Sequence, residues 1–241
     1  MSSIVQHAPR FSETDAVGIA HDLFGLKVSA KSLDSERDQN FHLETSDGKA
    51  FVLKLANATE TYEVLDLQNQ AMMHIIANFS SLNPERTGAP EVCTSVQGAW
   101  ISAVEGMNGA THFVRLLTYL PGKPFALVIP HDKDLLSSLG RFCGNLNHVL
   151  SDFDHAAAHR DFHWDLKNAR RVIERYLAFI DPPEKRDLVT RFLKRFQLES
   201  EPQLPHLRTS VIHNDANDYN VLVEPDAKWR NQVTGVIDFG D

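Results

Sequence analysis

The first half of the chain carries two hydrophobic periods, one typical of strands and one typical of helices. Apolar residues at helical spacing predict one helix after Ser12, a residue that can cap it, and a second helix that ends near Phe79. Short apolar runs predict strands at residues 28–33, 39–45, 50–56, 91–95, 99–104 and 111–120. We therefore expect residues 1–120 to form an antiparallel sheet with helices.

The pattern changes at the break Pro121-Gly122-Lys123-Pro124, which is the best candidate for a domain boundary. After it, apolar stripes at helical spacing cover residues 135–149, 172–180 and 188–196. Short apolar runs then return at residues 210–212, 221–223 and 233–237. The pattern predicts an α+β protein of two lobes, with a β-rich N-lobe at residues 1–120 and a mainly helical C-lobe at residues 121–241.

Composition narrows the class of protein. Of the 241 residues, 42% are hydrophobic, and the net charge is −8, which argues against general binding to nucleic acid or to anionic membranes. No run approaches the roughly 18 apolar residues that span a bilayer, and the first residues lack a signal-peptide core. The two cysteines, Cys93 and Cys143, sit in apolar stretches and read as buried free thiols. We therefore expect a cytoplasmic protein.

The chemistry is concentrated near the end of the chain. Residues 211–223 place eight mostly polar residues between apolar pairs, and this loop contains Asp215 and Asn220. Asp238 follows a second apolar run and precedes a glycine. Phosphoryl transfer needs a carboxylate that orients the acceptor hydroxyl, oxygen ligands for Mg²⁺ and a cation for the phosphates. Asp215, Asn220 and Asp238 can supply the oxygen atoms of this set.

The string His213-x-Asp215-x-x-x-x-Asn220, followed by Ile237-Asp238-Phe239-Gly240-Asp241, resembles the aminoglycoside phosphotransferase / choline kinase family, which has a protein-kinase-like fold. The resemblance implies that Asp215 is the catalytic base, that Asn220 and Asp238 bind Mg²⁺, and that His213 is structural. It also implies transfer of the γ-phosphoryl group of ATP or GTP to a hydroxyl of a small amine or amino-acid-like substrate.

Within that family, two segments look most similar to the hydroxylysine-kinase-type group. They are Ser35-Glu36-Arg37-Asp38-Gln39-Asn40-Phe41 and His159-Arg160-Asp161-Phe162-His163-Trp164-Asp165-Leu166. Bacterial relatives in that group are often fused to a class III aminotransferase, so the resemblance also implies a possible fusion partner of this kind.

A lysine and a glutamine stand out in the N-lobe. Strand alternation places Lys54 on the face opposite Phe51, Leu53 and Leu55, and the resemblance matches it to the lysine that contacts nucleotide phosphates. The alternative is an edge lysine with its ammonium in water. Gln68 falls where the family has a glutamate partner for this lysine, so it could hydrogen-bond Lys54 without neutralising it.

Two further segments are candidates for nucleotide binding. The Ser35 to Asn40 loop has no glycine, but its backbone N–H groups and the Ser35 hydroxyl could contact phosphate; otherwise it is a polar hairpin loop. By resemblance, Thr118-Tyr119-Leu120 is the hinge whose backbone holds the purine. From the residues alone it is a strand end.

Other interpretations remain open for the polar residues. Asp215, Asn217 and Asn220 could be ordinary turn residues. A catalytically silent nucleotide-binding or regulatory module would use the same side chains without turnover. A metal-dependent hydrolase could use His213, Asp215, Asp238 and Asp241.

Three histidines close together in the chain could also suggest a metal site, although no third ligand follows at a set spacing, and we favour a structural or interfacial role. They are His155, His159 and His163. By the family pattern, helices that follow the Asp238 loop complete the C-lobe. We therefore expect an incomplete C-lobe with exposed apolar surface, and weak turnover by this chain alone.

Overall fold

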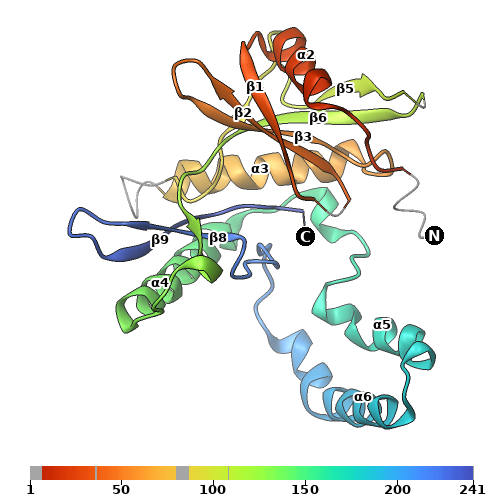
Figure 1. The fold of residues 1–241 in the computed structure, drawn as a ribbon. Coiled ribbons are helices and arrows are strands. Elements are labelled where there is room, and N and C mark those ends of the chain that lie inside the picture. Colours follow the sequence, from red (N-terminus) through yellow and green to blue (C-terminus); the bar gives the residue numbers. More distant parts are fainter. Residues whose placement is uncertain (1–6, 36, 80–86, 108, 241) are drawn as a thin grey trace.

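The structure is a computed structural model that describes residues 7–35, 37–79, 87–107 and 109–240. Its first part is a six-stranded antiparallel sheet with the strand order β1-β2-β3-β6-β4, in which β5 also pairs with β6 (Figure 1). The strands are β1 (Val28–Leu33), β2 (Gln39–Thr45), β3 (Ala50–Leu55), β4 (Val92–Cys93), β5 (Ser102–Glu105) and β6 (Thr111–Thr118).

Two helices cover opposite faces of this sheet (Figure 1). Helix α2 (Glu13–Phe24) begins with a capping box between Ser12 and Asp15 and ends at Gly25 in the left-handed conformation, as the sequence predicts. Helix α3 (Tyr62–Phe79) packs on the other face with eight buried residues. Because Leu53 and Leu55 point into the core under α2, alternation directs Lys54 toward the α3 face.

A smaller sheet of β7 (Lys123–Pro124), β8 (Val221–Pro225) and β9 (Asn231–Val236) follows the predicted boundary, in the order β7-β8-β9. Helix α4 (Lys133–Val149) lies against this sheet and against α3. A buried hydrogen bond from the Val233 N–H to the Ser138 hydroxyl, at 3.0 Å, joins β9 to α4. The core that α3, α4, β8 and β9 share holds the smaller sheet directly beside the first one.

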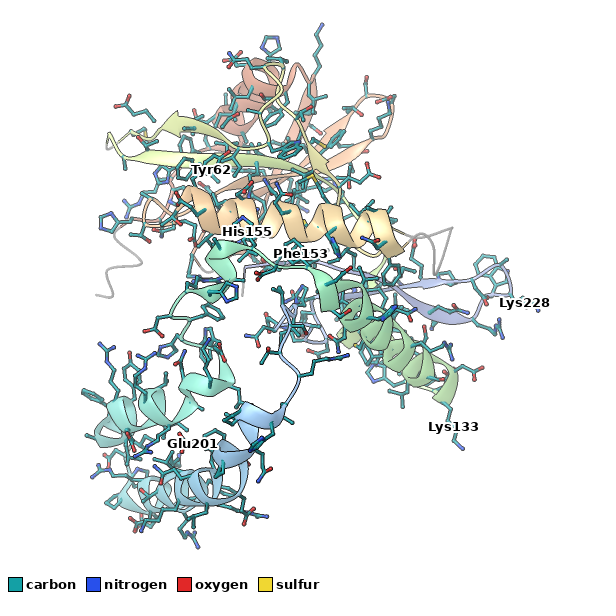
Figure 2. The ribbon with its side chains drawn as sticks, turned by 180° about the vertical axis from the view of Figure 1, so that it is seen from behind. Tyr62, Lys133, Phe153, His155, Glu201 and Lys228 are labelled. Atoms are coloured by element: carbon teal, nitrogen blue, oxygen red, sulfur yellow. The ribbon has the colours of Figure 1, made fainter. Side chains whose placement is uncertain are left out.

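Residues 166–206 form what we call the helical arm, which lies apart from both sheets (Figures 1 and 2). It comprises the helices α5 (Ala169–Tyr176) and α6 (Pro183–Arg195), the short 3₁₀ helices Leu166–Asn168, Leu177–Phe179 and Glu201–His206, and the π-helix Phe196–Ser200. Leu193 is the one buried residue of α5 and α6. Large apolar side chains such as Phe179 and Leu198 are exposed, so the expected apolar surface is present.

Three predicted strands differ from the structure. Residues 91–95 contain only the two-residue strand β4, and the predicted strand 99–104 begins at Ser102, because a turn closes from Ser95 to Ala99 with Gly98 in the left-handed conformation. The run 210–212 is not a strand, since none of the described strands pairs with it. Three further 3₁₀ helices, Phe125–Leu127, Leu150–Asp152 and Ala156–His159, complete the fold.

Both cysteines are free thiols and are partly buried. Burial raises the pKa of Cys93 to about 11, so this thiol stays protonated at neutral pH. None of the helices in the described residues is long and apolar enough to cross a membrane.

Candidate functional site

A cavity of about 500 Å³ opens between the two sheets and collects residues from distant parts of the chain. Lys54 comes from β3, while Asp215, Asn220 and Asp238 come from the loops that flank β8 and β9. Three other predicted site residues, Ser35, Asn40 and Gln68, also line it. The fold therefore brings seven of the sequence candidates to one place.

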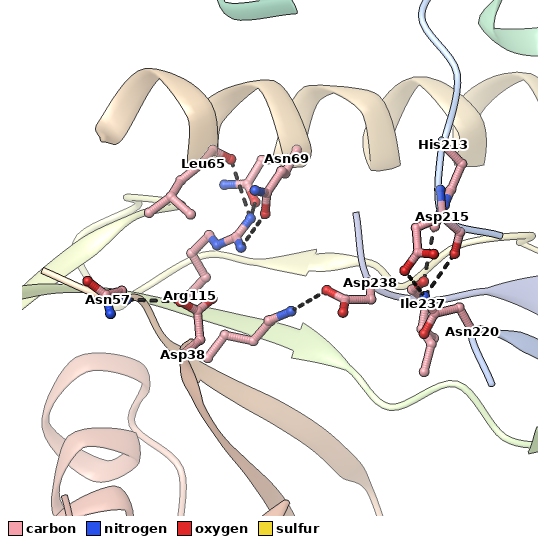
Figure 3. Close-up of polar contacts among 12 residues, drawn as sticks. Asp38, Asn57, Leu65, Asn69, Arg115, His213, Asp215, Asn220, Ile237 and Asp238 are labelled. Carbon is pink, nitrogen blue, oxygen red and sulfur yellow. Dashed lines mark hydrogen bonds and ion pairs between the residues drawn. The ribbon is translucent and has the colours of Figure 1, made fainter. Parts of the chain in front are cut away.

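The loop before β8 holds the Asp215 carboxylate in a fixed orientation. The Asn220 Nδ2 donates to Asp215 Oδ2 at 2.9 Å and to the Asp215 carbonyl at 2.8 Å (Figure 3). The Asn217 Nδ2 donates to Asp215 Oδ1 at 3.0 Å. The Asn217 Oδ1 accepts from the Tyr219 N–H at 2.8 Å, which closes an Asx turn. Asn214 has a left-handed backbone with φ 64°, which Asn tolerates better than most residues.

His213 ties this loop to the loop that follows β9. Its Nε2 donates to the Ile237 carbonyl at 3.1 Å, and its Nδ1 accepts from the Asp215 N–H at 3.3 Å. The ring also packs edge-on against Phe239 with centroids 4.7 Å apart. Burial lowers the pKa of His213, so the imidazole is neutral at pH 7 and keeps the tautomer that both bonds require.

Asp238 points toward Lys54, and the two side chains form an ion pair. Lys54 Nζ lies 3.2 Å from Asp238 Oδ1, and the lysine side chain is only 14% exposed. Because β3 is an inner strand and Lys54 reaches a carboxylate, Lys54 is not a solvated edge lysine. The Lys54 charge lowers the pKa of Asp238 and outweighs the partial desolvation of this carboxylate, which stays ionised.

Arg115 is a further polar residue near the site that was not predicted from the sequence, and its hydrogen-bond partner is Gln68. Arg115 lies opposite Lys54 in the pairing of β3 with β6 and is 3% exposed. Its guanidinium donates to the Gln68 Oε1 at 2.6 Å and to the Asn69 Oδ1 at 3.0 Å (Figure 3). The expected bond from Lys54 to Gln68 is therefore replaced by two pairs, Lys54 with Asp238 and Arg115 with Gln68. The sequence feature that could have indicated Arg115 is its position as a basic residue within the apolar run of β6.

Burial lowers the pKa of Arg115 to about 10, so its guanidinium is still charged at neutral pH. The acidic residues Asp38, Glu60 and Asp238 oppose that shift. The site therefore holds two cations side by side on one face of the sheet, one paired with a carboxylate and one with neutral amides.

The predicted hinge residues Thr118, Tyr119 and Leu120 are not among the described residues that line the cavity. The N–H groups of Thr118 and Tyr119 donate to the Glu91 carbonyl at 2.9 Å and the Ala50 carbonyl at 3.0 Å. These two N–H groups are already used within the fold, so binding of a purine by this segment stays a prediction.

The donor atoms of the cavity fit a hard cation. The carboxylates of Asp215 and Asp238 are oxygen donors, and the Asn220 Nδ2 faces Asp215, which leaves the Asn220 Oδ1 as a further oxygen ligand. In the described residues, no group of three or more His, Cys, Asp or Glu side chains is arranged for a metal. Mg²⁺ accepts such a sparse set, because it keeps waters and takes phosphate oxygens as ligands.

The histidines of the 155–163 segment have separate partners. His155 Nε2 lies 3.2 Å from Asp66 Oδ2 on α3, and His159 Nε2 lies 2.8 Å from Asp154 Oδ1. His163 packs against the rings of Trp164 and Tyr176. These contacts give the histidines structural roles. Asp241, which the hydrolase interpretation needs, lies outside the described residues.

The sequence of the chain is similar to those of known small-molecule kinases. The hydroxylysine kinase of Mus musculus is 33% identical over 97% of this chain, and the Danio rerio hydroxylysine kinase is 30% identical over 99%. The chain covers 65% of the length of the mouse protein and 68% of the zebrafish protein.

Solved structures share the fold at low sequence identity. An amicoumacin kinase in complex with AMP-PNP and Ca²⁺ has a TM-score of 0.68 at 14% identity and matches 100% of this chain and 67% of its own. A microcompartment-associated aminopropanol kinase has a TM-score of 0.64 at 17% identity and matches 95% of this chain and 70% of its own. The phosphotransferase enzyme family profile matches residues 29–241, and the chain belongs to that family.

Proposed function

We propose that this chain binds a nucleoside triphosphate with Mg²⁺ and transfers the γ-phosphoryl group to a hydroxyl of a small amine or amino-acid-like acceptor. One observation carries the proposal. A single cavity joins the Lys54–Asp238 ion pair, whose lysine side chain is largely buried, to an Asp215 carboxylate that two asparagine amides hold in place. These are the groups that phosphoryl transfer requires.

Asp215 is the group that handles the proton. As the acceptor oxygen forms its bond to the γ-phosphorus, the bond from that phosphorus to the bridging oxygen breaks and the nucleoside diphosphate leaves. The hydroxyl proton moves to the Asp215 carboxylate. Because Asn217 and Asn220 hold its two oxygens, the carboxylate stays aimed at the acceptor and loses little entropy when the substrate binds.

Asn220 and Asp238 are the proposed ligands of Mg²⁺, which neutralises phosphate charge when it is bound. The need for a metal is consistent with the charges in the cavity, where acidic residues outnumber basic ones five to two among the described lining residues. A triphosphate alone would be repelled by this surface. Lys54 is the proposed phosphate contact, and the ion pair with Asp238 holds its ammonium in position.

The relatives suggest the class of acceptor. Mouse, bovine and zebrafish relatives are named as hydroxylysine kinases, and a structural relative is named as an aminopropanol kinase. These names share a small molecule that carries both an amine and a hydroxyl. We therefore propose an amino alcohol or hydroxylated amino acid as the acceptor, with either ATP or GTP as the donor.

Replacement of Asp215 by Asn tests the assignment. We expect Asp215→Asn to lower kcat by about 10²–10⁴-fold while nucleotide affinity stays near normal, because the amide keeps the shape but cannot take a proton. The assay is an acceptor screen on the complete gene product, coupled to nucleoside diphosphate release. Asp218→Asn is the matched control, since Asp218 is an exposed acid of the same loop that does not line the cavity.

Full activity of the Asp215→Asn variant would remove Asp215 from the role of base. Thermal stabilisation of the wild-type protein by Mg²⁺ and nucleotide, without turnover of any acceptor, would instead favour a silent nucleotide-binding module.

A further inference from the structure

The loop between β1 and β2 covers the cavity with charged side chains. Its residues Asp34, Ser35, Arg37 and Asp38 all line the cavity, and the loop contains no glycine. Loops of this kind usually contact phosphate through backbone N–H groups, which glycine allows to come close. Here Arg37 adds a guanidinium to the lining of the cavity, so a side chain can supply donors for phosphate.

A buried asparagine fixes the loop above the cavity. Asn57, which follows β3 and is 3% exposed, donates its backbone N–H to Asp38 Oδ1 at 2.9 Å (Figure 3). Its Nδ2 donates to the Arg37 carbonyl at 3.2 Å. The Asn57 Oδ1 accepts from the N–H and the hydroxyl of Thr59. Since these bonds are sheltered from water, the backbone that carries Arg37 is held before any ligand binds.

The Arg37 guanidinium extends to the opposite wall of the cavity. One of its terminal nitrogens lies 3.9 Å from the position of a Cβ built on Gly240, so the side chain lies against the turn that carries Asp238. The positive charge of Arg37 also helps to keep the pKa of Asp238 below its usual range. Arg37 thus bridges the loop of the first sheet and the proposed metal-binding turn.

The distribution of positive charge in the cavity suggests a role for Arg37 in binding phosphate. Lys54 and Arg37 are the two basic side chains among the described residues that line the cavity, and they come from different sides of it, Lys54 from β3 and Arg37 from the loop before β2. Arg37 is the more exposed of the two. Because Asp215, the proposed base, lines the same cavity, the γ-phosphoryl group must lie in the cavity that Arg37 also lines.

We propose that Arg37 binds the γ-phosphoryl group of the nucleotide and stabilises the charge that spreads over its oxygens during transfer. This inference rests on the proposed function and assigns a further catalytic residue to it. A guanidinium is suited to the task because its planar set of N–H donors binds two phosphate oxygens at once. The donor would then be selected by its third phosphate as well as by its base.

The test compares a triphosphate analogue with a diphosphate in the complete gene product. Isothermal titration with Mg²⁺ and a non-hydrolysable ATP analogue should show about 10- to 100-fold weaker binding for Arg37→Gln, the loss expected for hydrogen bonds to a charged group. Binding of Mg-ADP should change by less than about 2-fold, because Lys54 and the proposed Mg²⁺ ligands are unchanged and ADP has no γ-phosphoryl group. Arg37→Lys should recover part of the loss, and kcat should fall with the affinity.

Arg191→Gln is the matched control, because Arg191 is an exposed arginine on α6 that does not line the cavity. Equal weakening of triphosphate and diphosphate binding would show that Arg37 only shapes the loop, and would overturn the inference. Unchanged binding of both would overturn it as well and leave the proposed function standing. A wild-type protein that binds neither nucleotide would remove the proposed function and this inference together.

Discussion

Helices α4 and α6 have similar amphipathic sequences, but the apolar face of α4 is buried in the structure and that of α6 is largely exposed. Helix α4 buries Leu135, Phe142, Leu146 and Val149 against the smaller sheet and α3, whereas α6 buries only Leu193. Both patterns predict a helix and the face that avoids water. A hydrophobic stripe therefore shows which face of a helix is favourable to bury. Whether that face is buried depends on where the other helices and strands lie.

The same contrast separates the site from the helical arm. All described residues that line the cavity come from the two sheets, from α3 or from the loops beside them, and the arm supplies none. The loop with Asp215 is followed by Val221, Leu222 and Val223, which are all buried. The polar groups of the site thus lie in the well-packed part of the molecule, because buried apolar residues on either side of a loop fix the position of that loop.

The largest difference between the two regions should come from removal of a phenylalanine. Phe142→Ala in α4 should lower the free energy of unfolding by about 3–5 kcal/mol, because the side chain is 5% exposed and leaves a cavity. Phe192→Ala in α6 should change it by about 0.5 kcal/mol or less, since that ring is 61% exposed. Urea unfolding of both variants measures the difference. Equal losses would mean that the arm is packed in solution.

Removal of an arginine should sharpen the comparison further. Arg115→Met should cost about 1–3 kcal/mol of stability, because the Gln68 and Asn69 oxygens lose their donor inside the protein. Arg195→Met in the arm should leave the urea midpoint almost unchanged, because its bond to Glu199 is exposed to solvent. Urea midpoints again give the two values. A cost for Arg195→Met that matches Arg115→Met would contradict the assignment of Arg115 as the structural partner of α3.

The smallest effect concerns pH and a histidine. The pKa of His213 in the folded state lies below its usual value of 6.5. Just below pH 6.5, His213 therefore binds a proton in the unfolded chain but not in the folded one. Stability should therefore fall as pH drops from 6.5 through the lowered folded pKa, and His213→Asn should reduce that slope. Urea unfolding at several pH values provides the test, and equal slopes for wild type and His213→Asn would falsify the assignment.

Much of the fold followed from local pattern. Period-2 alternation placed β1 and β2 at their observed bounds, and the capping box with Gly25 set the ends of α2. These features depend on neighbours within a few residues, which the sequence displays directly. The spacing of Asp215, Asn220 and Asp238 likewise predicted one site, because each polar residue stands beside an apolar anchor.

Partnerships between distant segments could not be predicted in this way. The Lys54–Asp238 pair spans 184 positions, and the Arg115–Gln68 bond spans 47. Nothing near Gln68 in the chain shows that Arg115 would face it, because the register of β6 against β3 determines which side chains meet under the sheet. The role of Asn57 likewise depends on the fold, because its burial and its bond to Asp38 show that it holds the loop above the cavity.

The sequence by itself thus determined the elements, the polar loop and the chemistry that its side chains can perform, since these depend on residue type and short-range spacing. The tertiary structure alone decided which cation pairs with which acid, that Arg37 lies over the Asp238 turn, and that α4 is covered while α6 is not. The physical reason is that charge pairing and burial are properties of surfaces that meet only after the chain has folded.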